Sequence, residues 1–329
     1  MSRCAIAIID DYQDVARTVA DWSAVAEHAD LRVFTRAWRD EDEIARELAP
    51  FAIIVLMRER TAFPARLIAR LPILRMIAMT GQRTTTLDIA ACTQRGIVVS
   101  HTGANPSSAP AEMAFALILA CARALPQGHA NVLRGQWEYG LPMGIALEGR
   151  RLGVVGLGKL GSKVARYGQA FGMDVVAWSQ NLTHEAAAVL GVARVDKAEL
   201  FATADVVSVH LALSPRSVGV IGRQEFALMK PGAIFVNASR GPLADEAALI
   251  DALRDGRIIA GLDVFDVEPL PPGHPFTTLP NVVLTPHLGY VVADTMRLFY
   301  ADSVENILAF LDGAPIRVAN PDVLQGARG

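Results

Sequence analysis

The 329-residue sequence contains only three cysteines, Cys4, Cys92 and Cys121, and no two of them form a CxxC pair. An odd, scattered set argues against a disulfide framework and a cysteine-based zinc site, and it is typical of a reducing compartment. An excess of charge of one sign is also absent, because the formal net charge is -3 and acidic and basic residues are interspersed. Nucleic acids and anionic membranes attract a concentrated basic field, so we expect neither as a partner.

Long apolar runs are missing as well. The longest, Met113 to Ala122, is about half the length that crosses a bilayer, and the helix expected over Met113–Arg123 suits a core or a subunit interface. The opening segment Cys4–Ile9 lacks the charged flank and cleavage signal of a secretory leader. No set of His, Cys, Asp or Glu has metal-ligand spacing. We therefore expect a soluble, cytoplasmic protein without a metal.

Short apolar runs, in contrast, alternate with amphipathic helical stretches along the whole chain. Continuous Val/Ile/Leu runs without strict alternation indicate strands buried on both faces, as in parallel sheets covered by helices. The fold class predicted is therefore α/β, with two doubly wound, Rossmann-like domains. The strands expected are Ala5–Ile9, Leu31–Phe34, Ile53–Met57, Met76–Met79, Ile97–Val99, Arg151–Val155, Asp174–Trp178, Val206–Val209, Ile234–Asn237, Ile259–Leu262 and Val282–Leu284.

The pattern breaks once, at Thr102-Gly-Ala-Asn-Pro106, before a long helix from about Ala111. A last helix from about Val291 to Leu311 has no strand set after it, so it has to pack on an earlier part of the chain. We predict a discontinuous substrate-binding domain, residues 1–103 plus 291–329. Residues 104–290 would form the dinucleotide-binding domain, with the active site in the cleft between the two.

Only the second strand set opens into a glycine loop. Gly156-Leu-Gly158-Lys159-Leu160-Gly161 follows a strand and opens a helix, as in dinucleotide-binding folds. The first glycine makes the tight turn, the second lets the backbone approach a pyrophosphate, and the third allows close helix packing. The first set runs instead into Asp10-Asp11-Tyr12, which keeps a pyrophosphate away from the backbone.

The nature of the dinucleotide depends on the end of the next strand. NAD sites carry an Asp or Glu there that holds the ribose 2′-hydroxyl, whereas this chain carries Ser179. Without a carboxylate nothing repels a 2′-phosphate, and Ser179 and Asn181 can donate hydrogen bonds to it. No arginine is present to neutralise the phosphate. NAD and NADP both remain open as cofactors, and Ser179 favours NADP slightly.

Polar residues follow the late strands of the second set. Arg240, Glu268 and His287 each come shortly after a strand, at the edge where α/β proteins bind ligands. Reduction of a 2-oxo acid by hydride transfer needs a cation for the carboxylate, a proton donor for the developing alkoxide and a partner for that donor. Taken singly, each residue has a simpler interpretation as a cap, a surface ion-pair partner or a solvated side chain.

Four ordered motifs around these residues resemble the D-isomer-specific 2-hydroxyacid dehydrogenase family, which includes glyoxylate/hydroxypyruvate reductases and 3-phosphoglycerate dehydrogenases. The likeness covers nearly the whole chain and is strongest from Leu147 to Gly289. The motifs are Leu228-Met-Lys-Pro-Gly232, Asn237-Ala-Ser-Arg-Gly-Pro-Leu-Ala-Asp-Glu246, Gly261-Leu-Asp-Val-Phe-Asp-Val-Glu-Pro269 and Thr285-Pro-His-Leu-Gly289.

The resemblance implies a role for each matching residue. Arg240 would bind the substrate carboxylate and polarise the carbonyl, His287 would exchange the proton, and Glu268 would pair with His287 so that the donor is charged near neutral pH. Asp263 would contact the nicotinamide carboxamide. The cofactor-binding set predicted is Gly156, Gly158, Lys159, Leu160, Gly161, Ser179, His210, Ser239, Asp263 and Gly289; the substrate-binding set is Arg58, Gly81, Gln82, Arg83 and Arg240.

The implied function is transfer of a hydride between NAD(P)H and a small 2-oxo acid or D-2-hydroxy acid, in a homodimer. A glyoxylate/hydroxypyruvate-type reductase is preferred, and a 3-phosphoglycerate dehydrogenase is the alternative, since Arg58, Arg60 and Arg83 suit a phosphate. A dinucleotide-sensing, corepressor-like protein is an alternative of another class. The substrate loop departs from the family pattern at Gly81-Gln-Arg-Thr-Thr-Thr86. Four other histidines show no partner pattern: His28, His129, His184 and His274.

Overall fold

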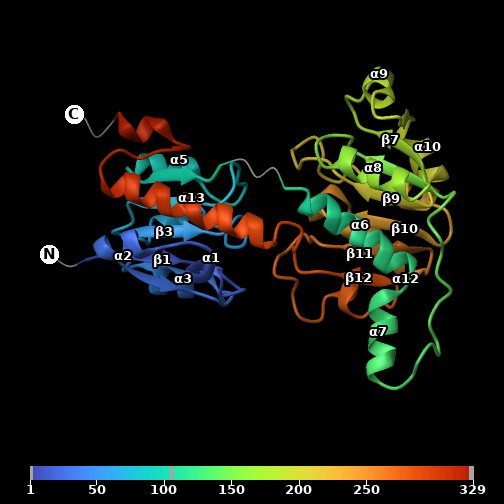
Figure 1. The fold of residues 1–329 in the computed structure, drawn as a ribbon, viewed down its shortest axis with the longest axis horizontal. Coiled ribbons are helices and arrows are strands. Elements are labelled where there is room, and N and C mark those ends of the chain that lie inside the picture. Colours follow the sequence, from blue (N-terminus) through green and yellow to red (C-terminus); the bar gives the residue numbers. More distant parts are fainter. Residues whose placement is uncertain (1–2, 104–106, 326–329) are drawn as a thin grey trace. The chain divides into compact units, whose positions relative to one another are not determined.

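The structure is a computed structural model that describes residues 3–103 and 107–325. The chain forms two compact units, Met1–Pro106 with Val292–Gly329, and Ser107–Val291. Each unit is built on one parallel sheet covered by helices (Figure 1). The predicted fold class, α/β with two doubly wound sheets, is confirmed.

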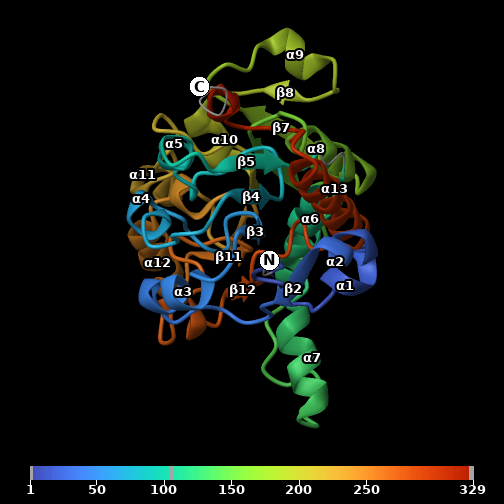
Figure 2. The same cartoon turned by 90° about the vertical axis from the view of Figure 1, so that its left-hand side faces the viewer.

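The sheet of the first unit has the strand order β2-β1-β3-β4-β5. Helices α3, α4 and α5 contribute apolar side chains to one core with the strands, whereas α13 packs beside α1 and α2 (Figure 2). Continuous apolar strands such as Ile53–Leu56 are fully buried because both faces are covered. The bounds are β1 Cys4–Ile8, α1 Ala16–Val19, α2 Ser23–His28, β2 Ala29–Val33, α3 Glu41–Leu48, β3 Ile53–Leu56, α4 Ala65–Ile68, β4 Met76–Met79, α5 Ile89–Gln94, β5 Val98–His101 and α13 Ala293–Leu311.

The edge strand β5 of this sheet is covered by the segment that follows α13. Val318 pairs with Ser100 in antiparallel fashion, and the Ala319 amide donates to the Val99 carbonyl. Asn320 is buried and completes the junction: its Oδ1 accepts from the Val99 amide at 2.9 Å, and its Nδ2 donates to the Ile97 carbonyl at 2.9 Å. The end of the chain therefore satisfies backbone groups that an open sheet edge leaves unpaired.

The second unit has seven strands in the order β12-β11-β10-β9-β6-β7-β8. Helices α6 and α8 share a core with one face of the sheet, and α10, α11 and α12 share a core with the other. The bounds are α6 Ala109–Ala122, α7 Leu125–Leu133, β6 Arg151–Val155, α8 Gly161–Ala170, β7 Asp174–Trp178, α9 His184–Ala188, β8 Ala193–Arg194, α10 Lys197–Thr203, β9 Val206–Val209, α11 Arg223–Leu228, β10 Ala233–Asn237, α12 Glu246–Arg254, β11 Ile258–Leu262 and β12 Val282–Leu284.

All strands predicted from apolar runs are present, with ends within two residues of those expected. The sequence reasoning missed β8, Ala193–Arg194, a two-residue edge strand paired with β7. Its residues are partly exposed, so the pattern that marks a doubly covered strand is absent.

Within the described ranges no single helix is long and apolar enough to span a membrane, although α6 and α7 together, bent by 63°, meet that test by length and composition. The apolar composition of α6 reflects its packing on β10 and β11. Gly261 on β11 permits this approach, because a Cβ there would lie 3.0 Å from Leu117 Cβ and 3.1 Å from Cys121 Sγ.

Asn320→Ala should destabilise the first unit. The substitution leaves the buried Val99 amide and Ile97 carbonyl without their side-chain partner, at a cost of about 2 to 4 kcal/mol. Urea unfolding followed by tryptophan fluorescence measures the change, since Trp22 and Trp38 lie in this unit. Asp322→Ala, an exposed neighbour, is the matched control and should unfold like the unmodified chain. Equal midpoints for both variants would contradict the role of Asn320.

Candidate active site

The glycine loop after β6 has the shape that a dinucleotide pyrophosphate requires. Gly156 has a φ of 101°, and a Cβ there would lie 2.8 Å from the His210 carbonyl oxygen. A Cβ at Gly161 would collide with the Gly156 carbonyl, so glycine alone lets α8 start against the loop. Gly158 has open space around it, with nothing within 4 Å of an added Cβ. The loop therefore offers backbone at a helix N-terminus, which is where phosphates bind.

The backbone of His210 lies directly against Gly156 of the loop. Its amide donates to the Val155 carbonyl at 2.7 Å, and its Nε2 lies 2.8 Å from Ser208 Oγ. Burial lowers the pKa of His210 to about 4, because a charged imidazolium loses its hydration there. His210 thus adds no positive charge to the loop, and a side-chain contact with the cofactor stays a prediction.

Ser179 follows β7 directly beside the glycine loop. The Gly156 amide donates to the carbonyl of Trp178 at 2.8 Å, which ties the two strand ends together. A lysine lies nearby: Lys197 Nζ is 5.6 Å from the centre of the Trp178 ring, and it forms an ion pair with Glu225 at 2.8 Å. The charge of Lys197 is therefore partly neutralised by Glu225.

Arg240 is carried by a tight turn after β10. Asn237, buried at the end of that strand, donates from Nδ2 to the Arg240 carbonyl at 2.8 Å and accepts from the Ser239 amide at 3.0 Å. Ser239 Oγ donates to the Val209 carbonyl at 2.8 Å. The backbone that presents Arg240 is thus fixed from both sides, and Ser239 serves as an anchor to β9.

His287 and Glu268 form a direct pair. Nδ1 of His287 lies 2.6 Å from Oε2 of Glu268, and the other carboxylate oxygen of Glu268 accepts from the Phe265 amide at 2.9 Å. The two side chains remain 24% and 29% exposed, so solvent and small molecules reach them. Because Nδ1 faces the carboxylate, Nε2 is the nitrogen that can exchange a proton with a bound molecule.

Asp263 anchors the loop that carries His287. Its buried carboxylate accepts from Thr285 Oγ1 at 2.6 Å, from the Leu288 amide at 2.8 Å and from the Gly289 amide at 2.8 Å. Burial raises the pKa of Asp263, and these hydrogen bonds counteract part of that rise. They also fix the backbone on both sides of His287, which has a φ of 54°.

The three predicted catalytic residues come from neighbouring strands. Arg240, Glu268 and His287 follow β10, β11 and β12, which are adjacent and parallel, so their carboxyl ends share one edge of the sheet. Gly241 brings two of these loops into contact, because a Cβ there would collide with the backbone of Phe265 and Asp266. A guanidinium, a histidine and its carboxylate partner are thereby arranged along the same edge as the glycine loop.

The predicted substrate residues other than Arg240 lie in the other unit, at the carboxyl edge of its sheet. Arg58 follows β3 and lies against Gly81, where an added Cβ would be 2.5 Å from Nη1 of Arg58. Gln82 and Arg83 are exposed. Their contact with a substrate stays a prediction.

Arg60, which the sequence offered as a further phosphate ligand, is engaged within its own unit. It donates to the Asp10 carbonyl at 2.5 Å and stacks on Tyr12 at 4.6 Å. Burial raises the pKa of the neighbouring Asp10 carboxyl to about 6, and the positive charge of Arg60 counteracts part of that rise.

Sequence reasoning did not predict the hydroxyl contacts of two threonines that support this region. Thr80 and Thr102 accept from the amides of Arg58 and Gly81 at 2.9 and 2.7 Å, and hydroxyl residues at strand ends were the available signal. His274, for which the sequence shows no partner pattern, has a partner in the folded chain: its Nε2 lies 3.2 Å from Glu246 Oε1. The two are 28 residues apart, so no local spacing reveals the pair. Among the described residues no cluster of three or more His, Cys, Asp or Glu suits a metal ion.

The chain is similar to known proteins over most of its length. D-3-phosphoglycerate dehydrogenase of Archaeoglobus fulgidus is 38% identical over 290 residues, which are 88% of this chain and 55% of that protein. Glyoxylate reductase of Aeropyrum pernix is 36% identical over 283 residues, 83% of this chain and 84% of that protein. A solved phosphoglycerate oxidoreductase of Vibrio cholerae shares 38% identity with a TM-score of 0.89, covering 94% of this chain and 100% of that one.

The chain spans about half the length of the phosphoglycerate dehydrogenases that it matches. The family model for the D-isomer specific 2-hydroxyacid dehydrogenase, NAD binding domain, matches residues 115–289, and it supports a nicotinamide dinucleotide as the cofactor. This range contains the glycine loop, Arg240, Glu268 and His287. The chain belongs to the D-isomer-specific 2-hydroxyacid dehydrogenase family.

Proposed function

We propose that this protein is an NAD(P)-dependent dehydrogenase that interconverts a small 2-oxo acid and the corresponding D-2-hydroxy acid. The observation that carries the proposal is the 2.6 Å pair of His287 and Glu268, on a loop fixed by Asp263. This pair lies on the sheet that also bears Arg240 and the glycine loop. Family membership supports the same chemistry.

A nicotinamide dinucleotide held by the glycine loop Gly156–Gly161 would supply the hydride for reduction of the carbonyl carbon. His287 gives the proton on Nε2 to the carbonyl oxygen, while Nδ1 remains paired with Glu268, whose negative charge stabilises the imidazolium before transfer. Arg240 neutralises the substrate carboxylate and polarises the carbonyl; a guanidinium suits this because its donors match a carboxylate in bidentate fashion. Oxidation of the hydroxy acid returns the proton to His287.

Asp263 has two roles in this proposal. Its three hydrogen bonds hold the backbone around His287 in place. Its carboxylate would also accept from the nicotinamide carboxamide, as the family resemblance implies.

We propose glyoxylate or hydroxypyruvate as the substrate class, with 3-phosphohydroxypyruvate as the second candidate. The first follows the relatives named glyoxylate reductase, of which the chain spans 84%. The second follows those named D-3-phosphoglycerate dehydrogenase, and Arg83 is an exposed cation that suits a phosphate. We also propose NADP as the preferred dinucleotide, because Ser179 stands where a carboxylate would repel the 2′-phosphate.

Absorbance at 340 nm tests the reaction, with NADH and NADPH crossed against glyoxylate, hydroxypyruvate and 3-phosphohydroxypyruvate. We expect rapid oxidation with glyoxylate or hydroxypyruvate, faster with NADPH than with NADH. Turnover of 3-phosphohydroxypyruvate alone would favour the second candidate substrate. A preference for NADH would contradict the role of Ser179, and nucleotide binding without turnover of any 2-oxo acid would favour a sensor.

His287→Asn should lower kcat by two to four orders of magnitude, roughly the contribution of a general acid–base group. Asparagine can still donate to Glu268 but has no proton to transfer near neutral pH. Steady-state kinetics with the best substrate of the panel measures the change. His184→Asn, on the exposed start of α9, is the control. Near-native turnover of the His287 variant would remove this residue from the mechanism.

We further propose a homodimer formed through α7 and the segment after it. Figures 1 and 2 show α7 extending away from its sheet. The segment exposes large apolar side chains, namely Val132 at 58%, Leu133 at 75%, Trp137 at 67%, Tyr139 at 82% and Met143 at 98%. Contiguous exposed apolar groups mark interaction surfaces, and a two-fold pair of such segments forms a closed interface.

Sedimentation velocity should give a particle of twice 35.3 kDa. Trp137→Ser combined with Tyr139→Ser should shift it to the single-chain mass, because the variant removes two apolar anchors of the interface. Val189→Ser, which changes an apolar side chain that is 84% exposed elsewhere on the unit, should leave the dimer intact. A single-chain mass for the unmodified protein would contradict the proposal.

A further inference from the structure

The loop between β11 and β12, residues 263–281, carries Glu268. It is longer than most connections between neighbouring helices and strands. Its outer part, from Asp266 to Gly273, is largely exposed. Two buried phenylalanines, Phe265 and Phe276, fix its inner ends, with ring centroids 6.3 Å apart. One polar side chain, His274, lies where the exposed part returns to the core.

His274 makes two hydrogen bonds that define its tautomer. Nδ1 accepts from the Phe276 amide at 3.3 Å; since an amide can only donate, Nδ1 carries no proton. A neutral imidazole then has its proton on Nε2, which lies 3.2 Å from Oε1 of Glu246. His274 is only 15% exposed, and its ring packs on Phe276 at 4.9 Å between centroids. The side chain is therefore held in one orientation.

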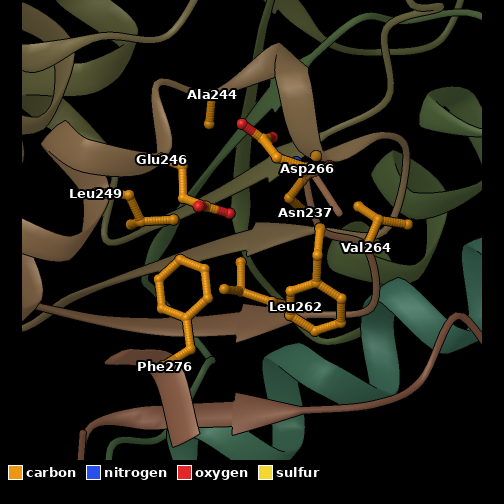
Figure 3. Close-up of a pocket in the computed structure, with 10 residues that line it drawn as sticks. Asn237, Ala244, Glu246, Leu249, Leu262, Val264, Asp266 and Phe276 are labelled. Carbon is orange, nitrogen blue, oxygen red and sulfur yellow. The ribbon is translucent and has the colours of Figure 1, made fainter. Parts of the chain in front are cut away.

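Glu246 is the first residue of α12, and the segment that joins it to Arg240 is short. The His274–Glu246 bond thus connects the Glu268 loop to the chain that follows Arg240. Gly241 makes the second connection, because its backbone lies directly against that of Phe265 and Asp266. Figure 3 shows a small space beside these connections, with the side chains of Glu246, Asp266 and Phe276 around it.

This space does not hold a ligand. Its volume is about 10 Å³, which admits at most one water molecule. The junction also gathers negative charge: burial, Glu246 and Asp245 raise the pKa of the Asp266 carboxyl. A largely buried polar side chain that links two loops by a hydrogen bond holds the loops in fixed positions relative to each other.

We propose that His274 is a positioning residue for the reaction: through Glu246 it fixes the loop that orients Glu268 toward His287. The inference rests on the proposed dehydrogenase function. Without the bridge, the exposed part of the loop gains freedom while the buried ends at Phe265 and Phe276 stay in place. Glu268 then spends less time within hydrogen-bond distance of His287, and the imidazolium loses its stabilising carboxylate.

The test compares His274→Phe with His274→Gln. Phenylalanine keeps the ring contact with Phe276 but removes both hydrogen bonds, whereas glutamine retains a donor for Glu246. His184→Phe on α9 is the control for a histidine-to-phenylalanine change at an exposed site. The measurements are kcat, KM for the cofactor, the pH profile of kcat, and hydrogen exchange of peptides from 263–281.

We expect His274→Phe to lower kcat about 10- to 100-fold, the range that small misplacements of catalytic groups cause, with KM for the cofactor unchanged. The pH midpoint of kcat for reduction should move downward, in the same direction as in Glu268→Gln, since both changes take a carboxylate away from His287. In the double variant that combines His274→Phe with Glu268→Gln, the pH midpoint of kcat should lie no lower than in Glu268→Gln alone, because the two residues act through one contact. His274→Gln should retain most of the activity.

A folded His274→Phe protein with native kcat and pH midpoint would overturn the inference. So would a lower kcat with an unchanged pH midpoint, which marks a loss of stability alone. Hydrogen exchange separates this failure from that of the proposed function. If the unmodified protein turns over no 2-oxo acid, the proposed function fails, while faster exchange of 263–281 in His274→Phe alone would still establish the bridge.

Discussion

The candidate site depends on one constraint, the parallel pairing of β10, β11 and β12 at the edge of the seven-stranded sheet. Parallel neighbours end at the same side, so the residues after each strand meet even though Arg240 and His287 are 47 positions apart in the numbering. Each of the three loops then needs its own fixing point, because a strand end alone leaves a following loop free. Asn237 fixes the first loop, Phe265 and His274 the second, and Asp263 the third.

The buried carboxylate of Asp263 organises the turn that carries His287. A buried carboxylate is costly unless hydrogen bonds compensate it, and the donors that do so here come from the turn that carries His287. The same hydrogen bonds that make the burial of Asp263 tolerable therefore define the backbone around His287. His210 illustrates the opposite solution, since burial keeps it neutral beside the glycine loop.

Steric limits complete the site where hydrogen bonds do not. Gly161 and Gly241 have almost no room for a side chain, and each lets two backbone segments touch. At Gly161 the contact joins a helix start to the phosphate loop; at Gly241 it joins the Arg240 turn to the Glu268 loop. A methyl group at Gly161 would push the start of α8 away from the phosphate loop. A methyl group at Gly241 would push the Arg240 turn away from the Glu268 loop, and the proposed chemistry needs both contacts.

The sequence by itself determined the fold class, the doubly covered strands and the family. Long apolar runs reveal doubly covered strands because burial on both faces leaves no polar alternation, and the glycine loop and the late motifs are local patterns that can be recognised without coordinates. The short strand β8 has neither property and was missed. For Arg240, Glu268 and His287 the residue pattern indicated only places after strands. The family resemblance implied that Glu268 pairs with His287, and the folded chain supplies the geometry of that pair, with 2.6 Å between Nδ1 and Oε2.

Only the tertiary structure decided which groups hold one another. The bonds of His274 to Glu246, of Asn320 to the β5 edge and of Thr102 to Gly81 join residues separated by many positions. The partners of these residues depend on the order of the strands and on the path of the loops. Local spacing in the sequence reveals neither the strand order nor the loop path. The physical reason is that apolar periodicity reports burial, a property of each segment alone, whereas a long-range hydrogen bond depends on where two segments come to lie after packing.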